Sequence, residues 1–250
     1  MSSICRRSTP ALSRLSISLT AILATTITTA LAAAVPETVE LTAEDGHRLT
    51  GTLWANGDAP GVVLLHQCNA DRSMYEELGA KLADAGFKAL SIDFRGFADS
   101  KGGGYDLSDA SREDWDRAMA GFPLDAEAAY AYLAQQGAGK VIGAIGASCG
   151  GYQLIPLARD HPELQRLAFF SSFLSPTQER DIFRLLPRQF LFIFATGDAR
   201  AARPAGTLAY RIGRDMSEQF QYEGDAHGYP LFEQDPDLAD KIVDWFALGL

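Results

Sequence analysis

The chain has 250 residues, of which 47% are hydrophobic and 22% are charged. This length suits one sizeable hydrophobic core, and the balance of apolar and charged residues excludes a disordered or collagen-like chain. The formal net charge is -10. A surface this acidic repels phosphate backbones and anionic membranes, so we expect no nucleic acid partner.

Residues 1–34 have the composition of a secretory signal peptide. They contain three arginines and no acidic residue, and the stretch 15–34 carries no charge. Small residues at its end offer cleavage after Ala32 or Ala34. Seven serines and threonines make the stretch weakly apolar for a permanent anchor. We therefore expect a periplasmic or secreted protein with residues 35–250 as its single domain and no stable membrane association after cleavage.

From residue 37 onward, short apolar runs alternate with helical patterns, which predicts a mostly parallel sheet covered by helices on both faces. The first two strands alternate polar and apolar residues around the turn Glu44-Asp45-Gly46, which predicts a hairpin. Most of the later strands are continuous apolar runs, typical of strands buried on both faces. The expected strands are 38–42, 48–54, 61–66, 88–93, 140–145, 166–171, 188–196 and 217–222.

Helical periodicity separates these strands. The expected helices are 73–85, 124–135, 149–159, 208–213 and 236–248. The segment 94–122 is glycine-rich in its first part and shows no clear periodicity. We expect it to be a long loop, and loops of that length in compact domains are usually functional or flexible.

A sharp turn with a serine at its tip is predicted after the strand 140–145. The segment Gly146-Ala147-Ser148-Cys149-Gly150 has the pattern Gly-x-Ser-x-Gly. Small residues two positions before and after the serine avoid collisions in such a turn, which lifts the hydroxyl above the sheet. The N–H groups that open the next helix then face a reacting carbonyl oxygen. Ser148 is therefore the candidate nucleophile.

An aspartate and a histidine follow Ser148 in the chain order that this chemistry requires. Asp198 comes just after a strand, at the carboxyl end where ligand-facing groups of parallel sheets gather. His227 lies in a loop after the last strand, with glycines on both sides. A neutral histidine can accept the serine proton, and a carboxylate can hold the ring in the required tautomer. Asp225 is too close in sequence to reach the far ring nitrogen easily, so Asp198 is the expected partner.

From about Val39 to the C-terminus, the chain resembles α/β-hydrolases of the dienelactone-hydrolase-like, lid-free kind. The resemblance rests on His66-Gln67, on Asp93-Phe94-Arg95-Gly96, and on the serine turn with its two partners. It implies an eight-stranded, mostly parallel sheet with helices on both faces and no separate lid domain. We read the aspartate and arginine of the second motif as a structural turn held by their mutual contact.

The resemblance also implies an oxyanion hole. Its donors would be the N–H of Cys149 and one N–H from the loop after His66, at Gln67 or Cys68. His66 would then brace that loop rather than act in catalysis.

The resemblance leaves the nucleophile open. Dienelactone hydrolases carry cysteine there, and a shift by one residue would place Cys149 at the tip, which is sterically possible. The glycine spacing favours Ser148. We expect a serine hydrolase that cleaves a small ester, thioester or lactone through an acyl-enzyme. The alternatives are an enzyme with Cys149 as nucleophile and a non-catalytic, hydrolase-like binding protein.

By the same resemblance, Cys68 and Cys149 lie close together in the folded chain. They either form a disulfide that ties the oxyanion loop to the serine turn or remain two small buried thiols, and we favour the thiols because free cysteines are often buried in this way. With His66 they offer only three candidate metal ligands without a usual spacing. We therefore expect no metal and no cofactor.

Overall fold

The computed structural model describes residues 34–55, 57–136 and 140–248. The expected signal peptide, apart from Ala34, lies outside the described residues. Within the described part of the chain, no helix is both long enough and apolar enough to cross a bilayer.

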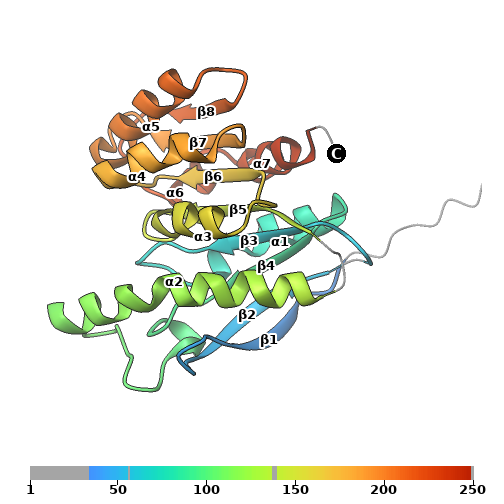
Figure 1. Ribbon diagram of the computed structural model, residues 1–250, viewed down its shortest axis with the longest axis vertical. Helices are drawn as coiled ribbons and strands as arrows, with labels where there is room; N and C mark the ends of the chain where they lie inside the picture. Colours follow the sequence, from blue (N-terminus) through green and yellow to red (C-terminus); the bar gives the residue numbers. More distant parts are fainter. Residues whose placement is uncertain (1–33, 56, 137–139, 249–250) are drawn as a thin grey trace, which may run out of the picture. The chain divides into compact units, whose positions relative to one another are not determined.

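One sheet of eight strands organises the described residues (Figure 1). The strands are β1 Glu37–Thr42, β2 Arg48–Trp54, β3 Gly61–Leu65, β4 Lys88–Ile92, β5 Val141–Ala147, β6 Arg166–Phe170, β7 Gln189–Ala195 and β8 Ser217–Tyr222. Their order in the sheet is β1-β2-β4-β3-β5-β6-β7-β8. The pairs β1–β2 and β2–β4 are antiparallel and all other neighbours are parallel. The expected eight-stranded, mostly parallel sheet is confirmed.

Helices cover both faces of this sheet. One face packs against α1 Glu76–Asp84, α6 Pro230–Gln234 and α7 Leu238–Ala247. The other packs against α2 Arg112–Gln135, α3 Leu154–Asp160 and α5 Ala199–Ile212, and α4 Pro176–Asp181 lies beside α5 in Figure 1. Short 3₁₀ turns complete the connections: η1 Arg72–Tyr75, η2 Ala98–Ser100, η3 Gly151–Gln153 and η4 Ile182–Leu185.

The alternation of side chains along the central strands builds the two core layers. In β3 all five residues are buried, with Val63 and Leu65 in the layer under α2 and Val62 and Leu64 in the layer under α1. A strand with an apolar side chain at every position can face helices on both sides. This explains why the continuous apolar runs of the sequence form central strands.

The expected loop 94–122 is wrong in its second half, because α2 begins at Arg112. Ser111 caps the helix: its side chain accepts from the backbone N–H of Asp114, whose carboxylate accepts from the Ser111 N–H. Pro123 lies inside the helix. A proline removes one backbone donor and usually ends a helix, so local sequence rules do not predict a helix that runs through it. Buried Phe122 and Ala126 on either side of the proline hold the helix to the sheet.

Three other helix predictions need correction. The helix α5 begins at Ala199, directly after Asp198, instead of at 208, and contains Pro204. The helix after the serine turn starts as η3 and becomes α-helical only at Leu154. The closing helix begins at Leu238. The short helices α4 and α6 were not predicted.

The expected contact between Asp93 and Arg95 is also wrong. Asp93 pairs with the Arg72 guanidinium and accepts the Arg72 backbone N–H at 2.8 Å. Arg95 pairs with Asp125 of α2 at 2.7 Å and with Asp45 at 2.5 Å. The physical reason is that the side chains of Asp93 and Arg95 reach partners on opposite faces of the sheet. Arg72 leads into α1, which covers one face, whereas Asp125 belongs to α2, which covers the other.

The two carboxylates around Arg95 differ in burial. Arg95 and Asp125 are 1% and 0% exposed, whereas Asp45 is 37% exposed. Asp125→Ala leaves a buried charge without its main partner, so the free energy of unfolding should fall by about 3–5 kcal/mol. The matched variant Asp45→Ala should cost about 1 kcal/mol or less. Urea unfolding of the three proteins measures both effects, and equal losses would contradict the assignment.

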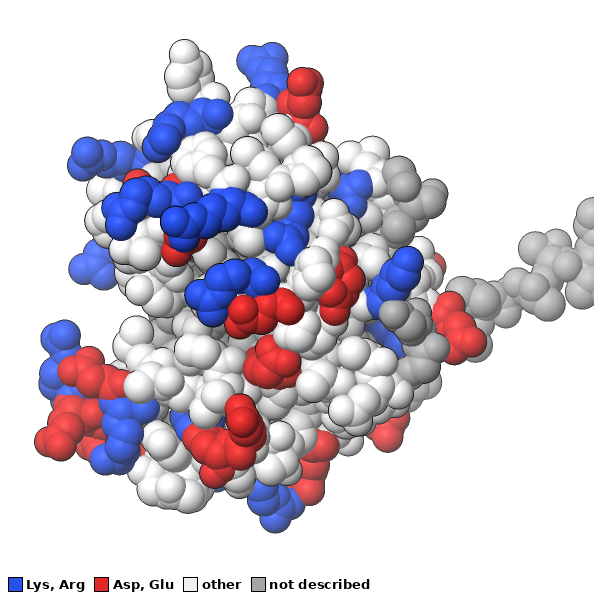
Figure 2. Space-filling model, viewed as in Figure 1, with Lys and Arg blue, Asp and Glu red and all other residues white. Residues whose placement is uncertain are grey.

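The surface charge is uneven. Figure 2 shows basic side chains gathered over α4 and α5, and a mixed group of acidic and basic side chains at the N-terminal end of α2. The same turns of α2 project beyond the sheet in Figure 1. The acidic excess of the chain is therefore not spread uniformly, and the surface of α4 and α5 is locally basic.

Candidate active site

Ser148 follows β5 directly and occupies the tip of a tight turn. Its φ is +50°, a left-handed conformation that costs a non-glycine residue about 1–2 kcal/mol. The Ser148 N–H donates to the carbonyl of Phe170 at 2.8 Å, and the Gly150 N–H donates to the carbonyl of Ala147 at 2.7 Å. These bonds hold the strained turn at the carboxyl edge of the sheet, as the Gly-x-Ser-x-Gly pattern predicts.

Two glycines make this turn sterically possible. A Cβ atom on Gly146 would lie 2.5 Å from the backbone of Gly150, and a Cβ atom on Gly150 would lie 2.3 Å from the carbonyl oxygen of Leu65. Both distances are far shorter than a carbon atom tolerates. The turn therefore packs backbone to backbone against the end of β3.

A hydrogen bond joins Asp198 to His227: the ring Nδ1 lies 2.6 Å from Asp198 Oδ2. Asp198 follows β7 and its side chain is 9% exposed, whereas His227 follows β8 and is 36% exposed. An ionised carboxylate can only accept, so Nδ1 carries the proton and Nε2 is left as an acceptor. Among the described residues, Asp225 makes no hydrogen bond to His227.

The His227 loop is fastened to the loops that flank the serine turn. The Gly228 N–H donates to Ser171 Oγ at 2.9 Å, and the Tyr229 N–H donates to Gln67 Oε1 at 2.8 Å. Ser171 follows β6 and Gln67 follows β3, which are the two neighbours of β5. The loop therefore lies along the same carboxyl edge as the serine turn.

The predicted nucleophile and the predicted base are not hydrogen-bonded to each other in the structure. Within the described part of the chain, no hydrogen bond joins the Ser148 hydroxyl to His227. Such bonds are often long without substrate and form in the Michaelis complex.

Sequence reasoning missed Ser171, which holds the histidine loop, and Ser172, whose Oγ donates to the Gly146 carbonyl at 3.0 Å. Two serines directly after a buried strand were the available signal.

His66 is completely buried at the end of β3. Its Nε2 accepts the Phe94 N–H at 3.0 Å, so Nδ1 carries the proton and donates to the Gln67 carbonyl at 2.7 Å. Burial lowers the pKa of His66 to about 4, and the bond to Gln67 acts in the opposite direction. The ring is neutral and braces the loop after β3, in agreement with the structural role that the resemblance implies.

The buried ring of His66 makes folding sensitive to acid. The unfolded chain binds a proton there below a pKa of about 6.5, whereas the folded chain does so only near 4. The contribution of the neutral His66 ring to the free energy of unfolding is therefore complete above pH 6.5. It falls by up to about 3 kcal/mol as the pH is lowered toward 4. His66→Gln, whose oxygen can accept the Phe94 N–H, should lose less over this range. Urea unfolding at pH 7 and 4.5 compares the two proteins, and identical losses would refute a neutral buried ring.

Cys68 and Cys149 form a disulfide, with their Cα atoms 5.8 Å apart. The favoured expectation of two free thiols is wrong, because the loop after β3 lies against the serine turn. The disulfide leaves Cys149 without a thiolate and both sulfurs without the charge that a metal ligand needs. The N–H groups of Gln67, Cys68 and Cys149, which are the expected donors of the oxyanion hole, form no hydrogen bond to another described residue.

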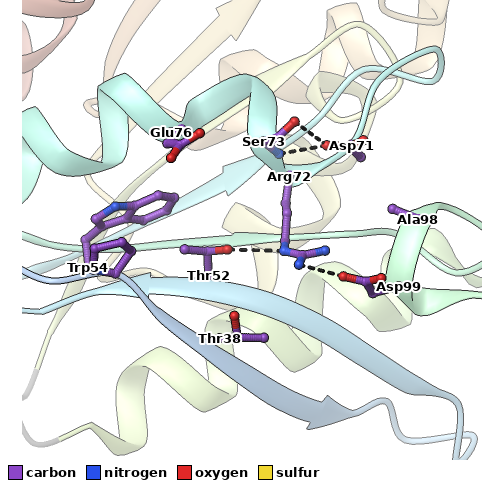
Figure 3. A pocket seen from close by; sticks show the side chains of 10 residues that line it. Thr38, Thr52, Trp54, Asp71, Arg72, Ser73, Glu76, Ala98 and Asp99 are labelled. Carbon is purple, nitrogen blue, oxygen red and sulfur yellow. Dashed lines mark hydrogen bonds and ion pairs between the residues drawn. The ribbon is translucent and has the colours of Figure 1, made fainter.

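A separate pocket of about 400 Å³ is lined by Asp71, Arg72 and Ser73, a few residues after Cys68, together with side chains that include Thr52 and Asp99 (Figure 3). Arg72 lines it, but its Nε donates to Thr52 Oγ1 at 3.1 Å and its guanidinium pairs with Asp99 at 2.7 Å. Neither Ser148, Asp198 nor His227 lines the pocket. In the described residues, no cluster of three or more histidine, cysteine, aspartate or glutamate side chains could hold a metal ion.

Comparison with solved structures identifies proteins of the same architecture. An esterase from Pyrococcus furiosus is 18% identical with a TM-score of 0.62, over 86% of this chain and 92% of that chain. A "CIB-like hydrolase" from Thermoplasma acidophilum is 16% identical with a TM-score of 0.64, over 85% and 98%. An esterase from Rhodococcus sp. ECU1013 is 16% identical with a TM-score of 0.63, over 84% and 98%. Identities this low show a shared fold only.

Comparison of the sequence itself identifies one family. No curated protein sequence matches the chain. A family model described as "Serine aminopeptidase, S33" matches residues 59–228, which is more than half of the chain and includes the serine turn, Asp198 and His227. The chain therefore has the α/β-hydrolase fold and belongs to this serine aminopeptidase, S33, family of hydrolases.

Proposed function

We propose that the protein is a serine hydrolase that cleaves a small ester, thioester or lactone through an acyl-enzyme on Ser148. The observation that carries the proposal is the 2.6 Å hydrogen bond between Asp198 and His227. It fixes the ring with Nε2 as the acceptor, along the edge of the sheet where the strained turn presents Ser148. Family membership supports a hydrolase, and the esterases of the same fold favour esters over other substrates.

The proposed reaction uses these groups in two steps. Ser148 Oγ attacks the carbonyl carbon while His227 Nε2 takes its proton, and Asp198 stabilises the resulting imidazolium. The N–H of Cys149 and that of Gln67 or Cys68 donate to the oxyanion. His227 then protonates the leaving group. In the second step the same ring takes a proton from water, which attacks the acyl-enzyme; the bond between the acyl carbon and Ser148 Oγ breaks, and the ring returns the proton to Ser148 Oγ.

Two alternatives receive less support. The disulfide removes the thiolate that a Cys149 nucleophile needs, so a dienelactone-hydrolase-type mechanism requires prior reduction. A non-catalytic binding protein has no need of the Asp198–His227 hydrogen bond beside a strained serine. The composition of residues 1–34 and the disulfide together support export, because disulfides persist in oxidising compartments.

The nucleophile and its partners can be tested with a fluorophosphonate label and p-nitrophenyl acetate. Ser148→Ala should remove the label and lower kcat by at least about 1,000-fold. Asp198→Asn should lower kcat by roughly 1,000- to 10,000-fold because the ring loses its orienting acceptor. Asp225→Asn is the matched control and should stay within about twofold of wild type. An unlabelled wild type would favour the binding protein, and a label lost only in Cys149→Ala would move the nucleophile by one residue.

The substrate class can be tested with a panel of p-nitrophenyl esters from acetate to laurate, run beside small lactones and alanine p-nitroanilide. The described residues include no separate lid domain that could cover a long acyl chain. We expect kcat/KM for acetate to exceed that for laurate by at least roughly tenfold. Preference for the anilide would instead favour the peptidase activity that the family description names.

A further inference from the structure

We propose that the Cys68–Cys149 disulfide is a positioning element of the oxyanion hole, with the backbone N–H of Cys68 as its second donor. The disulfide sets the separation between the Cys149 and Cys68 donors before substrate binds. This inference rests on the proposed function, because it requires an oxyanion to form at Ser148. It goes further by choosing between Gln67 and Cys68 and by assigning a role to the two sulfurs.

The backbone of Cys68 has little else to fix it. Its N–H and its carbonyl make no hydrogen bond to another described residue. The preceding residue is held well, because the Gln67 carbonyl accepts from His66 Nδ1 at 2.7 Å and from the Ala70 N–H at 3.1 Å. Cys68 therefore lies inside a turn that is closed between Gln67 and Ala70, and the disulfide connects Cys68 to the serine turn.

The distance between the two cysteines suits a shared acceptor. Two nitrogens that each lie roughly 2.9 Å from one oxygen are at most roughly 5.8 Å apart. Each amide nitrogen lies about 1.5 Å from its own Cα atom, and the two Cα atoms are 5.8 Å apart. This Cα separation allows the two nitrogens to lie anywhere from about 2.8 to about 8.8 Å apart, so a shared oxygen can be reached only when the turn around Cys68 holds its N–H toward that of Cys149. Donors held in place before the reaction are what make an oxyanion hole effective.

The serine turn itself does not depend on the disulfide. The Ser148 N–H is bonded to Phe170 and the backbone of Gly150 rests against Leu65. Loss of the sulfur bridge should therefore leave the nucleophile and the Cys149 donor in place and release mainly the Cys68 donor. A defect of this kind lowers the stability of the tetrahedral intermediate more than it lowers binding of the substrate.

The competing explanation is that the disulfide only stabilises the fold. Residues 68 and 149 are 81 positions apart, and a cross-link over such a separation restricts the unfolded chain. That role predicts a lower melting temperature but an unchanged kcat at temperatures where the protein is fully folded. Kinetics measured well below the melting temperature of each protein separate the two explanations.

The test compares wild type with the double variant Cys68→Ala/Cys149→Ala, which removes both sulfurs and keeps both N–H groups. With p-nitrophenyl acetate, kcat should fall by roughly 10- to 100-fold, which is less than the loss of a whole donor, while KM changes by less than about threefold. The affinity for a trifluoromethyl ketone, whose adduct with serine carries an oxyanion, should fall in parallel with kcat. An unchanged kcat together with a lower melting temperature would overturn the proposal.

Reduction of the wild-type protein provides a second arm that needs no substitution. Dithiothreitol supplies two electrons and two protons to the sulfurs and becomes a cyclic disulfide, leaving thiols at Cys68 and Cys149. After reduction, verified by alkylation and mass spectrometry, kcat should fall as in the double variant and should return on reoxidation. The double variant treated in the same way is the control and should not respond. A fully reduced wild type with full kcat would refute the proposal even if the variant does not fold.

The outcomes also separate this inference from the proposed function. If Ser148→Ala keeps its activity, the proposed function fails and no oxyanion forms at this turn. If Ser148→Ala is inactive while the double variant and the reduced protein keep the kcat of wild type, only the positioning role fails.

Discussion

The close approach of the serine turn to the end of β3 is the constraint on which the rest of the site depends. Gly150 has no side chain, so its backbone can rest against the carbonyl of Leu65, where a Cβ atom would lie only 2.3 Å from the oxygen. That contact sets the height of the turn above the sheet and places Cys149 beside the loop after β3. The disulfide follows from this approach, because Cys68 and Cys149 could not be bridged if the two backbones were held apart.

The order of the strands in the sheet determines where the other residues of the site lie relative to Ser148. The serine turn follows the central strand β5, and its neighbours β3 and β6 carry the loops that hold the histidine loop through Gln67 and Ser171. The aspartate arrives from β7, one strand further out, and the helix α5 starts immediately after it. Five loops, which follow β3, β5, β6, β7 and β8, therefore meet at one edge. Specific polar contacts hold them there, and the edge remains open enough for Ser148 and His227 to be partly exposed.

Much of this arrangement could be predicted from local patterns, and the failures have identifiable causes. Continuous apolar runs predict the central strands because each position faces a helix, and the Gly-x-Ser-x-Gly pattern predicts a turn whose sterics are local. The starts of α2 and α5 could not be predicted in this way, because Pro123 and Pro204 interrupt helices that tertiary packing sustains. The state of the cysteines and the partners of Asp93 depend on segments distant in sequence. Only the folded chain shows which of these segments meet.

The contact between Gln67 and the histidine loop has a further consequence. Gln67 Oε1 accepts the Tyr229 N–H, and a Cβ atom added to Gly228 would lie 1.7 Å from that same oxygen. The Gln67 side chain thus fills the space that any larger residue at position 228 would need, and the Gln67 backbone belongs to the loop that lies against the serine turn. The loop that carries His227 and the loop that carries Cys68 are therefore joined through one glutamine side chain. A shorter side chain at position 67 would empty this space and remove the acceptor of the Tyr229 N–H, while the φ of +68° at Gly228 would still favour glycine there.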